Sequence, residues 1–230
     1  MKILSLIYIP SILAFNLNNL SRKNVISSMS LSFFSIFKKY DRDLISSSNI
    51  NDKIMDDQNQ ESMIIETYKN NIFFYSEINK VSAFELEKSL LLLNEKLEDE
   101  PINLHIQSNG GSVFHTIYLI DLIQNINCPV HTYIDGYAAS SATLLSIAGK
   151  KRYMTKNSQM LIHQLSAGTK GKYSEIKDEN ENLDNLMNFI INQYLINTKL
   201  DKNILEDLLK RDIWLDSSTC LLYGLIDKIL

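Results

Sequence analysis

The segment GYAASSATLLSIAG, residues 136–149, decides our interpretation of the fold. Residues 130–134 before it have strand character, Gly136 ends that pattern, and a helical run of apolar residues follows Ser140. Small neighbours leave room for another molecule beside the Ser140 hydroxyl. A serine at a helix start gains from the positive end of the helix dipole, and nearby N–H groups can stabilise an oxyanion. Ser140 is therefore a candidate nucleophile, with a simple helix cap as the alternative.

Strand and helix patterns alternate on the amino-terminal side of this segment. Residues 71–78 form an aromatic and β-branched run typical of a strand, and Ser82 with Glu85 forms a capping box that predicts a helix start. Residues 102–107 alternate apolar and polar side chains like a half-buried strand, and residues 113–126 carry apolar residues at helical spacing. These units predict an α/β fold with a mostly parallel sheet and reactive residues at strand-to-helix junctions.

The carboxy-terminal side is mostly helical. Residues 173–198 predict a long helix with one apolar stripe, which needs a surface to pack against. Asp201 is a candidate cap for a short helix, and residues 217–230 predict a helix that stops at Gly224, followed by a short strand.

Three other segments carry candidate functional residues, and each is weak alone. Gly110 and Gly111 follow a predicted strand, where missing side chains let the backbone approach a ligand, although a Gly pair is ordinarily a turn. His163 ends the apolar strand 159–163, and a lone histidine there is ordinarily structural. Asp212 lies between a predicted helix and a predicted strand, where a surface acid is the ordinary case.

Together these segments resemble the proteolytic subunit of the Clp protease family over roughly residues 63–230. The stretches SNGGSV, GYAASSA, MLIHQ and KRDIWL are similar to the family's SPGGSV, GQAASMGA, MIHQP and ERDRFL, and YGLIDKIL matches its carboxy-terminal ending. The 30 residues from Gly110 to Ser140 and the 49 from His163 to Asp212 also agree with the family's spacing.

The resemblance implies a fold of the Clp and crotonase type, with repeated βαβ units and a long handle helix. It implies that Ser140 is the nucleophile, His163 the general base and Asp212 the carboxylate that orients the imidazole. The backbone N–H groups of Gly110 and Ser141 would form the oxyanion hole. The resemblance further implies hydrolysis of unfolded polypeptides in a ring-shaped chamber, as a homo-oligomer or a mixed double heptameric ring, with an ATP-driven unfoldase as partner.

Some positions depart from the family pattern without removing a catalytic group. Asn109 replaces a proline, Ser141 and Ala142 replace Met-Gly, and Leu165 replaces the proline that follows His-Gln. The family's axial loop has no match before the first predicted strand. A catalytically silent ring subunit is the main alternative, and an acyl-CoA hydratase or isomerase of the same fold class is another.

Residues 1–40 have a composition of their own, with five basic residues and no acidic one. An apolar run suited to a signal-peptide core precedes a Ser-rich, basic stretch typical of a transit peptide. This order resembles the bipartite leaders of proteins sent to plastids, and an extension on a cytoplasmic protein is the alternative. Residues 41–61 are polar and acidic, which predicts a linker before a peptidase domain at 62–230.

Composition argues against several other functions. The net charge of −4 and the pI near 5.6 give no basic field, so we expect no nucleic-acid partner. Cys128 and Cys220 form no CxxC pair, which favours two buried free thiols. The histidines show no HExxH spacing, so we expect no metal and no cofactor. The amino-terminal apolar run is too short and interrupted for stable membrane insertion.

The remaining histidines lack supporting motifs. His105 and His131 occupy predicted strand positions typical of packing or surface residues, and His115 lies in a predicted helix.

Overall fold

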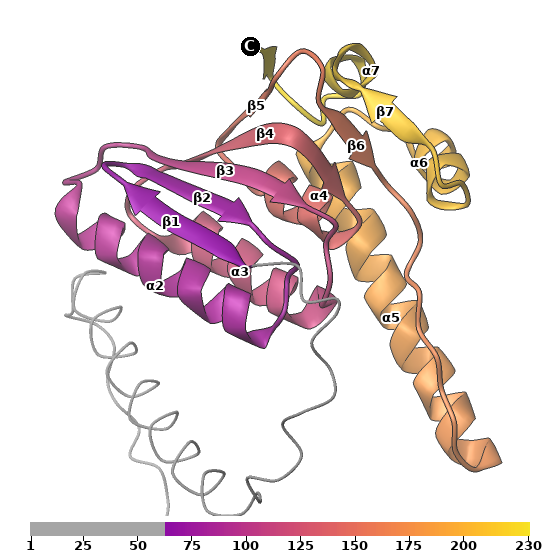
Figure 1. Ribbon diagram of the computed structural model, residues 1–230. Helices are drawn as coiled ribbons and strands as arrows, with labels where there is room; N and C mark the ends of the chain where they lie inside the picture. Colours follow the sequence, from indigo (N-terminus) through magenta and orange to yellow (C-terminus); the bar gives the residue numbers. More distant parts are fainter. Residues whose placement is uncertain (1–62) are drawn as a thin grey trace, which may run out of the picture. The chain divides into compact units, whose positions relative to one another are not determined.

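The computed structural model describes residues 63–230, and the expected leader and linker lie outside them (Figure 1). The elements in chain order are β1 (Ile64–Tyr68), β2 (Asn71–Tyr75), α2 (Lys80–Lys96), β3 (Ile102–Ser108), α3 (Val113–Asn125), β4 (Val130–Ala139), α4 (Ser141–Ile147), β5 (Lys151–Met154), β6 (Gln159–Leu161), α5 (Tyr173–Asn197), α6 (Lys202–Leu209), β7 (Trp214–Asp216), α7 (Ser217–Leu222) and β8 (Lys228–Ile229).

The strands form one mixed sheet in the order β1-β2-β3-β4-β5-β8. The strands from β2 to β8 along this path pair in parallel, and β1 pairs antiparallel with β2. β4 is long enough to serve two parallel partners, β5 along residues 131–134 and β6 along residues 137–139. β6 in turn pairs antiparallel with β7. The predicted α/β fold with repeated βαβ units is confirmed.

One face of the sheet packs against α2 and α3, which lie beneath it in Figure 1. β3 alternates as predicted, with Ile102, Leu104 and Ile106 fully buried and the residues between them half-buried. Leu86 and Leu90 of α2 are fully buried in the same core. Every second residue of the strand and every third or fourth residue of the helix is apolar. These side chains face one another and form one buried layer between the sheet and α2.

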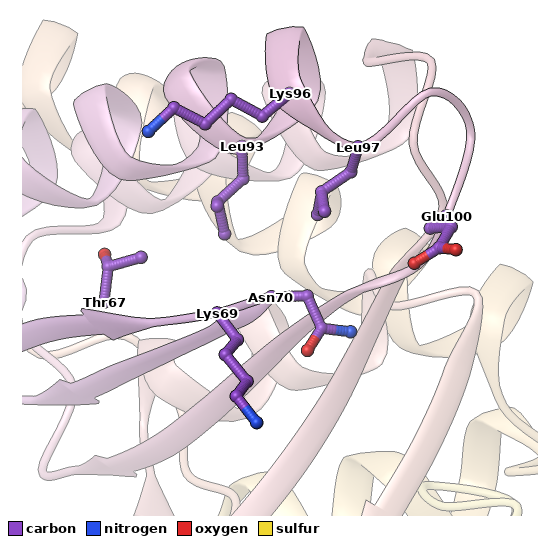
Figure 2. A pocket seen from close by; sticks show the side chains of 7 residues that line it. All are labelled: Thr67, Lys69, Asn70, Leu93, Lys96, Leu97 and Glu100. Atoms are coloured by element: carbon purple, nitrogen blue, oxygen red, sulfur yellow. The ribbon is translucent and has the colours of Figure 1, made fainter.

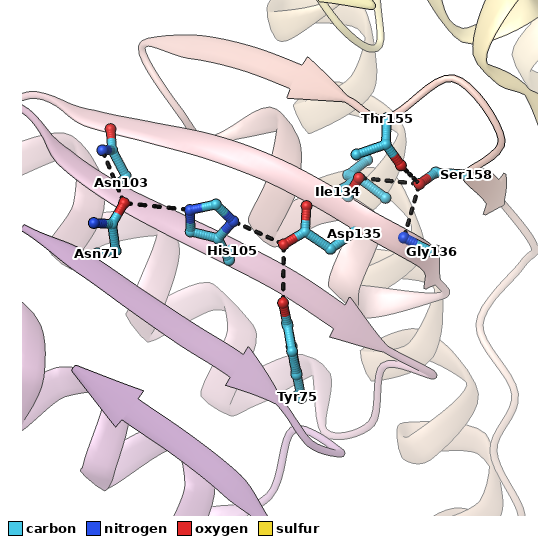
Figure 3. Close-up of polar contacts among 9 residues, drawn as sticks. All are labelled: Asn71, Tyr75, Asn103, His105, Ile134, Asp135, Gly136, Thr155 and Ser158. Atoms are coloured by element: carbon cyan, nitrogen blue, oxygen red, sulfur yellow. Dashed lines mark hydrogen bonds and ion pairs between the residues drawn. The ribbon is translucent and has the colours of Figure 1, made fainter. Parts of the chain in front are cut away.

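β4 extends further than predicted, because the strand continues through Gly136 to Ala139. Gly136 has φ 89°, a conformation that bends the chain without ending its pairing. Its N–H donates to Ser158 Oγ at 2.7 Å, and that hydroxyl donates to the carbonyl of Ile134 at 3.1 Å (Figure 3). Ser158 thus bridges the bend, which local sequence patterns did not reveal.

Two other predicted boundaries were wrong. The first helix begins at Lys80, because Asn79 is its cap and accepts hydrogen bonds from the N–H groups of Val81 and Ser82. Ser82 completes that capping box as its third helical residue instead of starting one. β6 ends at Leu161, two residues before His163. The strands β1 and β5 were not predicted.

The carboxy-terminal predictions are confirmed. α5 covers Tyr173–Asn197, and Figure 1 shows it projecting away from the sheet, with the chain from β6 running beside it. Asp201 caps α6 by accepting from two N–H groups, and Gly224 with φ 67° follows α7. None of the helices within residues 63–230 is both long and apolar enough to cross a membrane.

A row of stacked rings crosses the sheet face that α2 and α3 leave uncovered. Phe73 stacks on His105, His105 on Tyr133, and Tyr133 on Tyr153, each with ring centroids 4.7 Å apart. These residues are register partners on β2, β3, β4 and β5. Cross-strand pairs of this kind stabilise a sheet, so His105 packs as predicted.

His105 also belongs to a polar network on this face (Figure 3). Its Nδ1 lies 2.7 Å from Asp135 Oδ2, and its Nε2 lies 3.4 Å from Asn71 Oδ1. Tyr75 donates its hydroxyl to the same Asp135 oxygen at 2.9 Å. Burial, together with the hydrogen bond and charge of Asp135, raises the pKa of Tyr75 to about 12, so the phenol remains a donor at neutral pH.

Candidate active site

Ser140 lies at the junction between β4 and α4 in a conformation unusual for a residue with a side chain. Its φ is 55° and its ψ is −131°. A non-glycine residue held in such a sparsely populated region costs about 1–3 kcal/mol, and residues of this kind concentrate at functional sites. Its N–H donates to the carbonyl of Leu161 at 2.9 Å, and its hydroxyl makes no capping hydrogen bond. The side chain is therefore not used as a simple helix cap.

Gly110 packs directly against Ser140. A Cβ on Gly110 would lie 2.6 Å from the Ala139 carbonyl oxygen, 2.8 Å from Ser140 Cβ and 2.9 Å from Ser141 N. Gly110 also has φ 92°, so both space and backbone conformation require glycine here. Its N–H donates to Ser108 Oγ at 3.1 Å. The Gly-Gly loop after β3 and the start of α4 are thus in direct contact.

Ser141 is the first residue of α4, where a backbone N–H has no acceptor within the helix. Its hydroxyl donates to the Gly111 carbonyl at 3.2 Å, which ties the start of α4 to the Gly-Gly loop. Ser141 follows Ser140 in the chain and Gly110 packs against both residues, although the Gly110 N–H is bound to Ser108 Oγ.

The pairing of β6 brings the segments of Ser140, His163 and Asp212 together. β6 follows β4 in register, with Ala139 opposite Leu161, so the residues after β6 run beside Ser140. On its other edge, β6 pairs with β7 through Leu161 and Trp214. The strand pairing ends at this pair of residues, and His163 and Asp212 each lie two residues beyond it on their own segments.

The side chains of these three residues are not hydrogen-bonded to one another. The Nδ1 of His163 lies 2.6 Å from the carbonyl oxygen of Gln164. Asp212 is exposed, and its carboxylate makes no hydrogen bond to a residue within 63–230. The N–H of Gln164 donates to the Leu209 carbonyl at 2.7 Å, which fixes the chain after His163 against the end of α6. The segments that carry the three residues adjoin one another through β6, whereas the His163 ring faces a carbonyl of its own chain.

Two residues beneath the site escaped the sequence analysis. Thr143 donates its hydroxyl to the Ser140 carbonyl at 2.6 Å, and its N–H donates to the same oxygen at 3.0 Å. Tyr194 of α5 is buried, and its hydroxyl contacts Thr143 Oγ1. A threonine three residues after a candidate nucleophile is a local signal, but 51 residues separate Thr143 from Tyr194, and no sequence pattern links them.

One hollow on the surface lies away from these residues. It has a volume of about 570 Å³ and opens between the end of α2 and the turn from β1 to β2, with Lys69, Lys96 and Glu100 among its lining (Figure 2). A second hollow of about 300 Å³ borders the strands of the site and is lined by Tyr137 and Trp214. Of these two hollows, the second adjoins the strands next to the candidate residues.

Both cysteines are buried free thiols, as predicted. Burial, followed by the charge of Asp216, raises the pKa of the Cys220 thiol to about 12, which keeps it protonated and unreactive at neutral pH. Within residues 63–230, no group of three or more His, Cys, Asp or Glu side chains is arranged to hold a metal ion.

Comparisons with known proteins agree with this architecture. The family model described as Clp protease matches residues 56–230. The ATP-dependent Clp protease proteolytic subunit 1 of Rhodopirellula baltica is 34% identical over 164 residues, covering 69% of this chain and 71% of the relative. The proteolytic subunit 2 of Treponema denticola is 31% identical over 175 residues, covering 74% of this chain and 88% of the relative.

The mixed sheet with its flanking helices is the α/β fold of this class of hydrolases. The chain belongs to the Clp protease family. It is accordingly a serine peptidase.

Proposed function

We propose that the chain hydrolyses peptide bonds of unfolded polypeptides with Ser140 as nucleophile. His163 accepts the Ser140 proton and later protonates the leaving amine, while Asp212 holds the imidazole in the required tautomer. The N–H groups of Gly110 and Ser141 stabilise the negative charge that develops on the scissile carbonyl oxygen, and for this the Gly110 N–H must exchange Ser108 Oγ for the oxyanion.

The register of β6 is the observation that carries this proposal. One three-residue strand pairs with the strand leading to Ser140 and with the strand that follows Asp212, and His163 comes two residues after it. The segments that carry Ser140, His163 and Asp212 are distant in sequence, and the pairing of β4 with β6 and of β6 with β7 brings them side by side. The contact of Gly110 with Ser140 and Ser141 supports the assignment of the oxyanion hole.

Catalysis then requires the His163 side chain to turn. Its ring must leave the Gln164 carbonyl and point between Ser140 and Asp212. Turning the half-buried His163 ring breaks its hydrogen bond to the Gln164 carbonyl, which costs about 1 kcal/mol. Catalytic hydrogen bonds are often formed only when substrate is bound, so the resting geometry is compatible with this step.

We further propose that the chain works as a ring-shaped oligomer, either of one subunit type or mixed, with an ATP-driven unfoldase. The printed names of both relatives describe proteolytic subunits of an ATP-dependent protease. Large apolar side chains are exposed on the outer side of the α2 and α3 layer. They are Val81, Phe84, Leu91, Leu92, Phe114 and Tyr118.

This exposed helical surface and the stacked rings lie on opposite sides of the same subunit. If the helical surface of one subunit contacts the ring-bearing face of the next, the contact joins two different surfaces and is heterologous. Repeated heterologous contacts form a closed ring when the rotation between neighbouring subunits divides a full turn. The projecting α5, of which only Ile190 and Tyr194 are fully buried, offers a further surface for joining two rings.

We propose that residues 1–40 are a bipartite plastid leader, on the basis of their composition alone. Amino-terminal sequencing of the mature protein tests this proposal. An intact Met1 in the active assembly would exclude cleavage and would favour the alternative of a cytoplasmic protein with an extension.

Labelling with a fluorophosphonate probe tests the nucleophile. Wild-type protein should be labelled and should cleave a fluorogenic peptide, while Ser140→Ala should do neither, because the attacking oxygen is gone. Ser146→Ala is a matched control, since it removes a hydroxyl from the same helix but away from the site. Equal labelling of wild type and Ser140→Ala would reject Ser140, and an unlabelled, inactive wild type would favour the catalytically silent subunit.

A further inference from the structure

A chain of hydroxyl groups runs from α5 to the backbone of Ser140. The hydroxyl of Tyr194 contacts Thr143 Oγ1, and Thr143 Oγ1 lies 2.6 Å from the Ser140 carbonyl oxygen. Thr143 is fully buried, and Tyr194 is 2% exposed. Buried hydroxyl groups with such partners hold their geometry, because leaving one unpaired costs about 1–3 kcal/mol.

The direction of these hydrogen bonds follows from the number of protons. A carbonyl oxygen only accepts, so Thr143 must donate its single hydroxyl proton to the Ser140 carbonyl. The Thr143 oxygen can then only accept from Tyr194, which makes Tyr194 the outer donor. Burial raises the pKa of the Tyr194 phenol well above its usual value of 10, so the phenol keeps this proton at neutral pH.

The carbonyl at the end of this chain belongs to the peptide that joins Ser140 to Ser141. A trans peptide is planar, and its C=O and N–H point in opposite directions. Fixing the direction of the Ser140 carbonyl therefore fixes the direction of the Ser141 N–H. A hydrogen bond accepted by the C=O also polarises the N–H of the same peptide, by cooperativity of roughly 10–30% per bond.

We propose that Thr143 and Tyr194 are positioning residues that aim the Ser141 N–H into the oxyanion hole. The inference rests on the proposed function, in which that N–H stabilises the oxyanion and Ser140 is the nucleophile. Neither side chain touches the substrate. They act on the Ser141 N–H by holding the peptide plane between Ser140 and Ser141. The Thr143 N–H also donates to the Ser140 carbonyl oxygen of this peptide, at 3.0 Å.

Four variants of the full chain test the proposal, with steady-state peptide hydrolysis, unfolding midpoint and sedimentation as measurements. Thr143→Val keeps the shape and removes the donor to Ser140, and Thr143→Ser restores a hydroxyl. Tyr194→Phe removes the outer donor, and the double variant Thr143→Val with Tyr194→Phe leaves no buried hydroxyl without a partner. Replacing both partners by apolar groups of the same shape can be nearly neutral for stability, so this variant should fold.

Thr132→Val is the matched control. Thr132 is also fully buried and donates its hydroxyl to a carbonyl of α4, that of Ser146 at 2.7 Å, but at the opposite end of the helix. Its loss should lower the unfolding midpoint without changing kcat.

We expect Thr143→Val to lower kcat by about tenfold with KM within about twofold, below the roughly 10²–10³-fold cost of deleting an oxyanion donor. Thr143→Ser should recover most of kcat. Tyr194→Phe should lower kcat by about threefold, because Thr143 keeps its own hydrogen bond but loses polarisation. In the double variant, stability should recover while kcat stays as low as in Thr143→Val.

Three outcomes would overturn the proposal. The first is a normal kcat in Thr143→Val, measured alongside an active wild type and an inactive Ser140→Ala. This result would refute the positioning role of Thr143 but leave the proposed function intact. The second is a kcat that follows the unfolding midpoint across all variants, Thr132→Val included. The third is a wild-type protein without Ser140-dependent hydrolysis, which would refute the proposed function as well.

Discussion

Replacing Gly110 by alanine should damage the site far more than the same change at Gly136. The two glycines have nearly equal φ values, 92° and 89°, so an added Cβ imposes similar backbone strain of about 1–2 kcal/mol at each. A Cβ on Gly136 would meet only the Gln107 side chain at 3.4 Å, an ordinary contact. A Cβ on Gly110 would meet the Ala139 carbonyl oxygen at 2.6 Å.

The size of the effect follows from these distances. Real Cβ atoms do not approach other atoms closer than about 3.0 Å, so the backbone at Ala139 and Ser140 must move by at least about 0.4 Å. Overpacking of this kind costs about 1–3 kcal/mol, in addition to the strain that Gly136→Ala shares. A misplacement of 1 Å can cost roughly 100-fold in rate, so a shift of about 0.4 Å at the proposed nucleophile should cost about sixfold or more.

The assay measures the free energy of unfolding by denaturant titration and kcat/KM on a fluorogenic peptide. We expect Gly136→Ala to lose stability but retain activity, and Gly110→Ala to lose more of both. If the two variants lose equal stability and equal activity, the contact of Gly110 with Ser140 has no functional consequence and the reasoning is wrong.

Three further changes test other contacts of the fold. Arg152 binds the Asp227 carboxylate through its side chain and its backbone N–H. Burial by itself would raise the pKa of Asp227, but the hydrogen bonds and the charge of Arg152 outweigh it and hold this pKa below its usual value. Asp227→Asn should therefore lower the unfolding free energy above about pH 4, with a difference from wild type that disappears as the pH falls through the folded-state pKa in an acid titration. Ser146 Oγ is buried without a hydrogen-bond partner among the described residues, so Ser146→Ala should raise the unfolding free energy by about 1 kcal/mol, and a destabilised variant would contradict this account. Asn79 caps α2 through two N–H groups, so Asn79→Ala should cost about 1 kcal/mol in denaturant titration, and no loss would show that the cap is dispensable.

The sequence predicted the elements whose residues repeat with a clear period. The alternation at Ile102, Leu104 and Ile106 gave β3, and the apolar stripe of residues 173–198 gave α5. β1 and β5 escaped because they are short and half-exposed. Their pairing depends on neighbours in the sheet, and these are distant in sequence.

The candidate site was predictable only in part, for a related reason. Ser140, His163 and Asp212 each belong to a local motif, and the family spacing connects them. The direction of the His163 ring is set by a rotamer and a single hydrogen bond, which no motif encodes. No sequence pattern indicated a role for Tyr194, because only tertiary packing brings it into contact with Thr143.

The position of β6 has a consequence for biogenesis. Ser140 and Asp212 are 72 residues apart in the chain, and a strand of three residues holds their segments together. Contacts across such a separation form late, because the entropy of closing the loop must be overcome first. In the proposed site, a nascent or truncated chain in which β6 and β7 are not paired would lack its Asp212. Under the proposed function, proteolysis would therefore begin only after the carboxy-terminal strand pair has formed.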